Sequence, residues 1–243
     1  MKFVFRALIF LLPTLLAVGV HAQNLQTGLN ALDAENYPLA FSHLTPLAEN
    51  GDARAQTYLG IMYGNGHGVP TDFAQALRLL RAAAAQENAI AELHLGFMYE
   101  GGDGVPSSIH KAVSWYHKAA EHGDEFAQYF MGFAYERGEG ISQNFQLAHH
   151  WYLMAAKQND SASHTALGNL YEFGDGVPEN NILALMWYII AVIHLDEYDR
   201  LNGGQEEKVS DMEYIEAKLT EAEISLAMDL VEICLASNYR ECG

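Results

Sequence analysis

The sequence predicts an all-α fold, built as a stacked array of antiparallel helix pairs. A five-residue pattern, Leu-Gly-x-x-Tyr in its commonest form, begins at Leu59, Leu95, Met131 and Leu167, 36 residues apart each time. Each copy is followed by a glycine-rich loop and then by an alanine-rich segment, which contains Trp-Tyr in three of the four copies. Self-similarity at such a period is typical of solenoid repeats, whose usual role is to bind other molecules.

The first segment of each repeat is expected to be a helix, called helix A. Ala55, Leu59 and Met62 fall at helical spacing and predict one packed face. Gly60 and its copies Gly96, Gly132 and Gly168 lie inside these helices, where glycine costs about 1 kcal/mol relative to alanine. Their recurrence predicts that a neighbouring helix approaches too closely to leave room for a side chain.

The loop and the second helix of each repeat, helix B, also follow a rule. A glycine pair ends helix A in every copy and supplies the positive φ angles of a sharp reversal; the pairs are 66/68, 102/104, 138/140 and 174/176. The N-cap of helix B is expected at residues that accept well from free amides: Asp72, Ser108, Asn144 and Asn180. The recurring alanines and tryptophans of helix B predict helix packing rather than a cofactor site.

These patterns resemble the Sel1-like repeat, a relative of the tetratricopeptide repeat. The resemblance rests on A-x-x-x-L-G-x-x-Y in helix A, G-x-G-V-P in the loop and A-x-x-W-Y-x-x-A-A in helix B, and it covers residues 53–194 well. It implies a right-handed superhelical solenoid that acts as a protein-binding adaptor or scaffold. Many members of this family are exported bacterial proteins, and some are involved in contact with host cells.

The repeats divide the chain into predicted segments. Arrays need modified ends, so we expect helix pairs that act as caps on both sides of the repeats. The predicted order is a signal peptide (1–22), an N-terminal capping helix pair (23–52), repeats at 53–88, 89–124, 125–160 and 161–194, and C-terminal capping helices (195–243).

The N-terminus predicts export. Lys2 and Arg6 precede an apolar run, and Val20-His21-Ala22 offers small residues for cleavage after Ala22. The alternative is a retained membrane anchor, but about 14 apolar residues are short for a span that needs roughly 20. We therefore expect a periplasmic or secreted protein with no membrane span after signal removal.

The charge excludes one class of partner. The whole chain carries 13 basic and 31 acidic residues, a formal net charge of −18, and removal of Lys2 and Arg6 makes it −20. Nucleic acids and anionic lipid surfaces bind through clustered Lys and Arg, so we expect no nucleic-acid partner. Because half of the residues are hydrophobic, the chain is expected to fold rather than to form an acidic disordered tail.

The chain has two cysteines, Cys234 and Cys242, eight residues apart near the C-terminus. In an exported protein an even pair predicts a disulfide, which would tie the tail to the last helix. Two free thiols are the alternative.

One motif invites an enzymatic interpretation. Ser108-Ile109-His110-Lys111 matches the S-x-x-K of serine acyl enzymes, and some cysteine-rich members of the Sel1-like family have been described as β-lactamases. The companion S-D-N and K-T-G motifs are missing, however, and so is a cysteine pattern in each repeat. Ser108 also occupies the N-cap position, so we interpret it as a helix cap and expect no catalytic residue.

Metal and cofactor sites are not predicted. His110 and His117 share a helix face and His149-His150 lies in the next repeat, but no H-E-x-x-H or paired Cys/His spacing occurs. Weak calcium binding by recurring loop acids, such as Glu100 with Asp103, remains an alternative to solvated loops. We expect no metal and no cofactor.

The binding prediction rests on residues that vary between copies. On helix A, away from the packed face, the first copies carry apolar and aromatic side chains, which in solenoids of this kind line the concave surface. This predicted partner face comprises Tyr58, Ile61, Ile90, His94, Phe97, Phe126, Phe130 and Phe133. The alternative is that they pack successive A helices together. In the fourth copy the positions hold Ala162, Ala166 and Asn169, where we expect the belt to end.

We therefore expect a non-enzymatic, exported adaptor or scaffold that binds a protein or peptide through the concave helix-A surface, in the envelope or in contact with a host cell. Two alternatives remain open: a β-lactamase-like or cell-wall hydrolase, and a purely structural envelope component.

Overall fold

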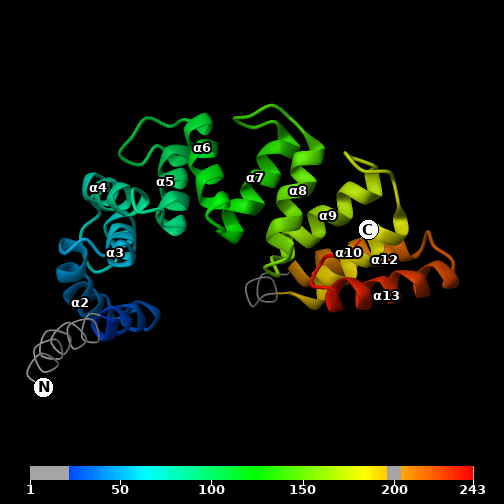
Figure 1. Cartoon of the computed structure of the whole chain (residues 1–243), viewed down its shortest axis with the longest axis horizontal. Coiled ribbons are helices and arrows are strands. Elements are labelled where there is room, and N and C mark those ends of the chain that lie inside the picture. The colour runs from blue at the N-terminus through cyan, green and yellow to red at the C-terminus, as the bar shows by residue number, and fades with distance from the viewer. Residues whose placement is uncertain (1–21, 196–203, 243) are drawn as a thin grey trace, which may run out of the picture. The chain divides into compact units, whose positions relative to one another are not determined.

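The computed structural model describes residues 22–195 and 204–242, and every regular element in these ranges is a helix (Figure 1). The chain divides into two compact units, residues 1–107 and 108–243, each with a hydrophobic core of its own. Residues 1–21, which hold nearly all of the predicted signal peptide, lie outside the described residues. None of the described helices combines the length and the apolar character that crossing a membrane requires.

The first unit is made of consecutive helices. Residues 22–33 form a helix, and the helices α2 (Tyr37–Glu49), α3 (Ala53–Asn65), α4 (Phe73–Ala84) and α5 (Ala89–Gly101) follow. Helix A of the first repeat is α3 and its helix B is α4, and the two pack closely together. The hydrophobic core of the first unit is aliphatic and includes Leu25, Leu29, Leu44, Leu47, Leu59, Met62 and Leu79.

The second unit continues the alternation. Its repeat helices are α6 (Ile109–Glu121), α7 (Glu125–Arg137), α8 (Phe145–Ala156), α9 (Ser161–Phe173) and α10 (Asn181–Ile193). The pairs α7/α8 and α9/α10 pack closely, and α12 (Gly204–Glu216) and α13 (Glu221–Ala236) pack on α10. The predicted all-helical architecture of packed helix pairs is confirmed.

The loop that joins helix A to helix B has the predicted geometry. Gly66 ends α3 with φ 73°, and its amide donates to the carbonyl of Met62. The amide of Asp72 then donates to the Tyr63 carbonyl at 2.9 Å, and the Asp72 carboxylate accepts from the Gln75 amide at 3.0 Å. The predicted N-caps are confirmed at all four positions: Asp72, Ser108, Asn144 and Asn180.

The glycines inside helix A have the predicted packing role. A Cβ built on Gly132 would lie 2.5 Å from the Tyr152 ring of α8, and one on Gly168 would lie 2.4 Å from the Tyr188 ring of α10. In the third and fourth repeats the tyrosine of helix B therefore packs against the backbone of its helix A, at the point where a side chain is missing. In the first repeat Leu80 replaces the tyrosine, and its Cγ would lie 3.0 Å from a Cβ on Gly60.

The C-terminal helices close the hydrophobic core of the second unit. Trp187, fully buried in α10, stacks on Tyr239 with ring centroids 6.2 Å apart. The predicted disulfide joins Cys234 of α13 to Cys242 and so spans Tyr239. The Tyr239 hydroxyl lies 3.1 Å from Nε2 of the buried His164 on α9. The disulfide therefore anchors the tail at the end of the repeats.

Candidate functional site

The eight residues of the predicted partner face lie on three A helices. Tyr58 and Ile61 are on α3; Ile90, His94 and Phe97 are on α5; the remaining three, Phe126, Phe130 and Phe133, are on α7. Two of them are exposed, Ile90 at 37% and Phe126 at 54%, and the other six are half-buried. That these residues bind a partner stays a prediction, and their surroundings differ enough to separate their roles.

Two of the eight have clear packing partners within their own unit. The Phe130 ring stacks on Tyr116 of α6, with centroids 5.1 Å apart and planes at 21°. Tyr58 packs against the aliphatic core of the first unit. For this pair the alternative interpretation, packing between helices, describes at least part of what the side chains do.

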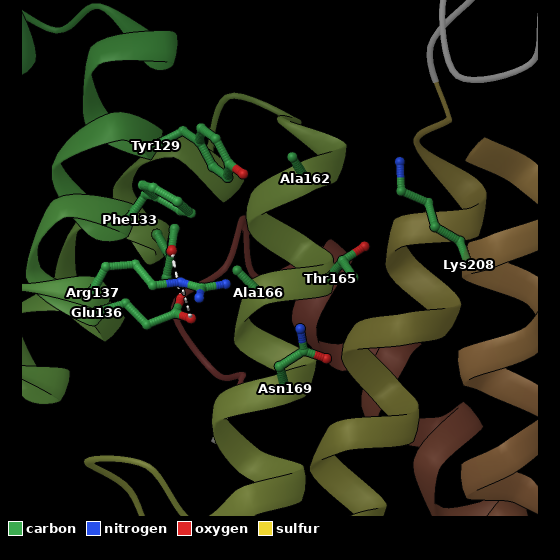
Figure 2. A pocket seen from close by; sticks show the side chains of 10 residues that line it. Tyr129, Phe133, Glu136, Arg137, Ala162, Thr165, Ala166, Asn169 and Lys208 are labelled. Atoms are coloured by element: carbon green, nitrogen blue, oxygen red, sulfur yellow. Dashed lines mark hydrogen bonds and ion pairs between the residues drawn. The ribbon is translucent and has the colours of Figure 1, made fainter. Parts of the chain in front are cut away.

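Phe133 faces a hollow of about 320 Å³ in the second unit, which we call the α7–α9 hollow (Figure 2). Tyr129, Phe133, Glu136 and Arg137 of α7 form one wall, with Tyr152 of α8 behind them. The opposite wall is formed by small or polar side chains of α9 together with one lysine of α12: Ala162, Thr165, Ala166, Asn169 and Lys208.

The α7 wall combines aromatic surface with charge. Phe133 lies alongside Tyr129, with ring centroids 6.5 Å apart and planes at 30°. The Arg137 guanidinium carbon lies 5.4 Å from the Phe133 ring centre, and Arg137 Nε lies 3.9 Å from a Glu136 carboxylate oxygen. The hot spots of protein interfaces are enriched in tyrosine, tryptophan and arginine, and two of these residue types are present here.

The carboxylate of Glu136 is hydrogen-bonded by a tyrosine of helix B, Tyr152 of α8. Tyr152 donates a hydrogen bond to Glu136 at 2.7 Å, and burial together with this carboxylate raises the Tyr152 pKa far above its usual value. The next repeat repeats the arrangement, since the Tyr188 hydroxyl lies 2.9 Å from Glu172. This tyrosine–carboxylate pair fixes the floor of the α7–α9 hollow.

Lys208 places a basic side chain at the opposite edge of the same hollow. It is buried, and its Nζ lies 2.6 Å from Ser161 Oγ at the start of α9. Sequence reasoning missed Lys208, because it lies beyond the residues in which the 36-residue period holds.

A second hollow, of about 180 Å³, lies in the first unit between α3 and α5, above α4; we call it the α3–α5 hollow. Three of the predicted residues line it: Ile61, His94 and Phe97. Burial lowers the His94 pKa to about 4, so the imidazole is neutral at pH 7, and its ring meets Phe97 edge to face at 5.6 Å. The hollow is therefore mainly apolar.

The residues that the sequence offered for metal binding or catalysis can also be placed. Within residues 22–195 and 204–242, no three histidine, cysteine, aspartate or glutamate side chains are grouped as a metal site. Ser108 caps α6, with its hydroxyl 3.5 Å from the Lys111 amide, as its copies cap the other B helices. That geometry gives Ser108 a structural role at the start of α6.

Comparison with known proteins identifies the repeats. The profile of the Sel1 repeat matches five times, at residues 16–52, 53–88, 89–124, 126–160 and 161–192. The chain belongs to the Sel1 repeat family. The first match covers the helix pair ahead of the four repeats and also reaches into the predicted signal peptide. Sel1 repeats typically mediate protein interactions, and the fold is generally a non-catalytic scaffold.

Solved Sel1 repeat structures share the fold. A Sel1 repeat protein from Oxalobacter formigenes is 32% identical, covers 71% of each chain and has a TM-score of 0.66. The protein c5321, a protective antigen present in uropathogenic Escherichia coli strains, is also 32% identical with a TM-score of 0.66. That match covers 75% of this chain but 40% of c5321. A Sel1 repeat protein from Klebsiella pneumoniae shares the fold at 15% identity and a TM-score of 0.52. None of the curated proteins matches this sequence.

The sequence contains a sign of the α7–α9 hollow, but we interpreted it as the end of the binding surface. The change to Ala162, Ala166 and Asn169 suggested the end of an apolar belt. In the structure these small side chains leave the space that Phe133 faces. The Tyr152–Glu136 pair was also detectable, since both residues recur with the 36-residue period at Tyr188 and Glu172.

Proposed function

We propose that this Sel1 repeat protein is an exported adaptor that binds a protein partner through the exposed faces of its A helices. The observation that carries the proposal is the α7–α9 hollow, in which three aromatic rings, an arginine and a lysine border a space of about 320 Å³. A groove of that composition suits a peptide segment that inserts one apolar side chain and hydrogen-bonds at the edges.

Export rests on the N-terminal sequence and on the disulfide. Lys2, Arg6 and the following apolar run have the features of a secretory signal. Disulfides persist mainly in oxidising compartments, and the Cys234–Cys242 bond fits such a location. Because the similar protein c5321 is a protective antigen of pathogenic strains, we propose the cell envelope or a host-contact surface as the place to look for the partner.

The test uses matched phenylalanine substitutions in the affinity-tagged full chain, expressed in its source cell. Phe133→Ala removes the ring that faces the α7–α9 hollow, whereas Phe173→Ala removes a 68% exposed ring that does not line it. We expect Phe133→Ala to weaken co-purification of the partner at least tenfold, or about 1.4 kcal/mol, and Phe173→Ala to leave it unchanged. Equal retention by both variants, with circular dichroism unchanged, would refute the proposal.

A further inference from the structure

The first repeat departs from the later ones at both members of the tyrosine–carboxylate pair. Tyr152 and Glu136, like Tyr188 and Glu172, are joined by hydrogen bonds of 2.7 and 2.9 Å. At the matching positions of the first repeat, 36 residues earlier at each step, stand Leu80 and Gly64. A ring, a hydroxyl and a carboxylate are therefore missing together.

The α3–α5 hollow lies where those groups are missing. Gly64 and Leu80 both line it, and it extends down to the backbone of Gly60 and to Ala76 of α4. In the second unit the residues equivalent to Gly60 and Ala76, Gly132 and Ala148, do not line the α7–α9 hollow, because the Tyr152 ring lies on Gly132.

The size and the lining of the α3–α5 hollow define what it accepts. Its walls include Ile61, Phe73, Phe97 and Met98, and neutral His94 adds a further ring. A cavity of about 150 Å³ with apolar walls holds benzene, so about 180 Å³ accommodates a phenyl ring.

The charge of the first unit selects the neighbours of that ring. Between residues 22 and 107 the sequence has nine acidic and three basic side chains. Asp103, near the start of the loop after α5, is the charged residue among those that line the hollow. A partner segment that carries a lysine or arginine beside its aromatic residue is therefore favoured over an acidic one.

We propose that the α3–α5 hollow is a pocket for one phenylalanine side chain of a partner peptide, with a basic residue next to it in the sequence. The assignment rests on the proposed protein-binding function, and it adds the residue type that is bound, the site and the sequence change that opens it. In the third and fourth repeats the tyrosine–carboxylate pair occupies the equivalent space. In the first repeat that space is part of the pocket.

The test follows the Met98 methyl group in the purified full chain, labelled with ¹³C at its methionine methyls and titrated with Ac-Gly-Phe-Lys-Gly-NH₂. We expect a saturable shift of the Met98 resonance, with Met131 of the second unit unaffected as an internal reference. Ac-Gly-Phe-Glu-Gly-NH₂ should bind at least fivefold more weakly, and Ac-Gly-Ala-Lys-Gly-NH₂ should cause no shift. Absence of a Met98 shift, or equal shifts with the alanine peptide, would overturn the proposal.

Rebuilding the missing pair supplies the decisive variant. Gly64→Glu with Leu80→Tyr copies residues 136 and 152, and a Cβ on Gly64 has ordinary contacts, the nearest at 3.7 Å. The folded double variant should lose at least ten-fold in affinity for the Phe-Lys peptide. Leu80→Phe with Gly64 retained is the second variant and should also weaken binding. Undiminished affinity in either folded variant would contradict the proposal.

The outcome of the peptide titration is independent of the outcome of the Phe133→Ala experiment. Peptide binding at Met98 would persist if the cellular partner did not depend on Phe133, and loss of the partner in Phe133→Ala would stand even if Met98 never shifted.

Discussion

At the scale of single residues, the molecule is organised by where helix A lacks a side chain. Gly132 and Gly168 receive the tyrosine rings of helix B, and these tyrosines in turn hold Glu136 and Glu172. The glycine thereby sets how closely helix A and helix B approach each other. Through the tyrosine it also sets the position of the carboxylate. Gly64 differs, because no ring lies on it.

Alanine at two helical glycines should therefore have opposite effects on stability. Gly132→Ala places a Cβ 2.5 Å from the Tyr152 ring, and such overpacking should lower the free energy of unfolding by about 1–3 kcal/mol. Gly64→Ala meets its nearest neighbour at 3.7 Å and should raise it by about 0.5 kcal/mol, because alanine restricts the unfolded chain. Urea denaturation measures both, and a destabilised Gly64→Ala together with a neutral Gly132→Ala would contradict this packing.

Buried His164 makes the second unit sensitive to acid. Burial lowers its pKa from 6.5 to about 3, so the folded state refuses a proton that the unfolded state accepts. Stability is fully present above pH 6.5 and should fall on acidification between pH 6.5 and about 3, by up to about 1.4 kcal/mol per pH unit.

All three tryptophans lie in residues 108–243, so their fluorescence in urea reports on unfolding of this unit. His164→Asn should flatten the dependence of its stability on pH between 6.5 and 5. An unchanged slope in this variant would mean that other groups cause the acid sensitivity.

At the scale of elements, the helix boundaries were predictable from the sequence because each follows from local chemistry. Glycine pairs at positive φ end every A helix, and Asp72, Ser108, Asn144 and Asn180 start every B helix. The hollows were not predicted, because they depend on which residues face one another. The role of Ala166 depends on the placement of α9 across the hollow from Phe133. The role of Leu80 depends on the packing of its counterpart, Tyr152, on Gly132.

The C-terminal tail is the element whose attachment depends on a covalent bond. The Cys234–Cys242 disulfide closes a short loop that holds Tyr239 against Trp187 and His164. Cys234→Ser with Cys242→Ser should lower the stability of the second unit by about 2–3 kcal/mol, as expected for closure of such a loop. Tryptophan fluorescence in urea measures this loss.

A reducing agent supplies the control for the disulfide. It should destabilise the wild-type protein to a similar extent and leave the double serine variant unchanged. If the wild-type protein were equally stable with and without reductant, the tail would be held by packing alone.

At the scale of the whole molecule, a strongly acidic chain places two of its 13 basic residues beside one hollow. The formal net charge is −18, yet Arg137 and Lys208 both border the α7–α9 hollow. The conserved spacing of the repeats sets the helix framework, while the binding features arise from positions that differ between copies. The repeat framework and the family were therefore readable from the sequence, whereas Lys208 lies outside the periodic region and needed the structure.

The central claim is that a protein binds at the α7–α9 hollow, which lies beside the A helix α7. The most direct measurement is photo-crosslinking in the source cell with p-benzoylphenylalanine incorporated at position 133 or, as the control, at position 173. The account predicts one discrete crosslinked protein from position 133 and none from position 173. Crosslinks that are absent at position 133, or the same at both positions, would contradict it.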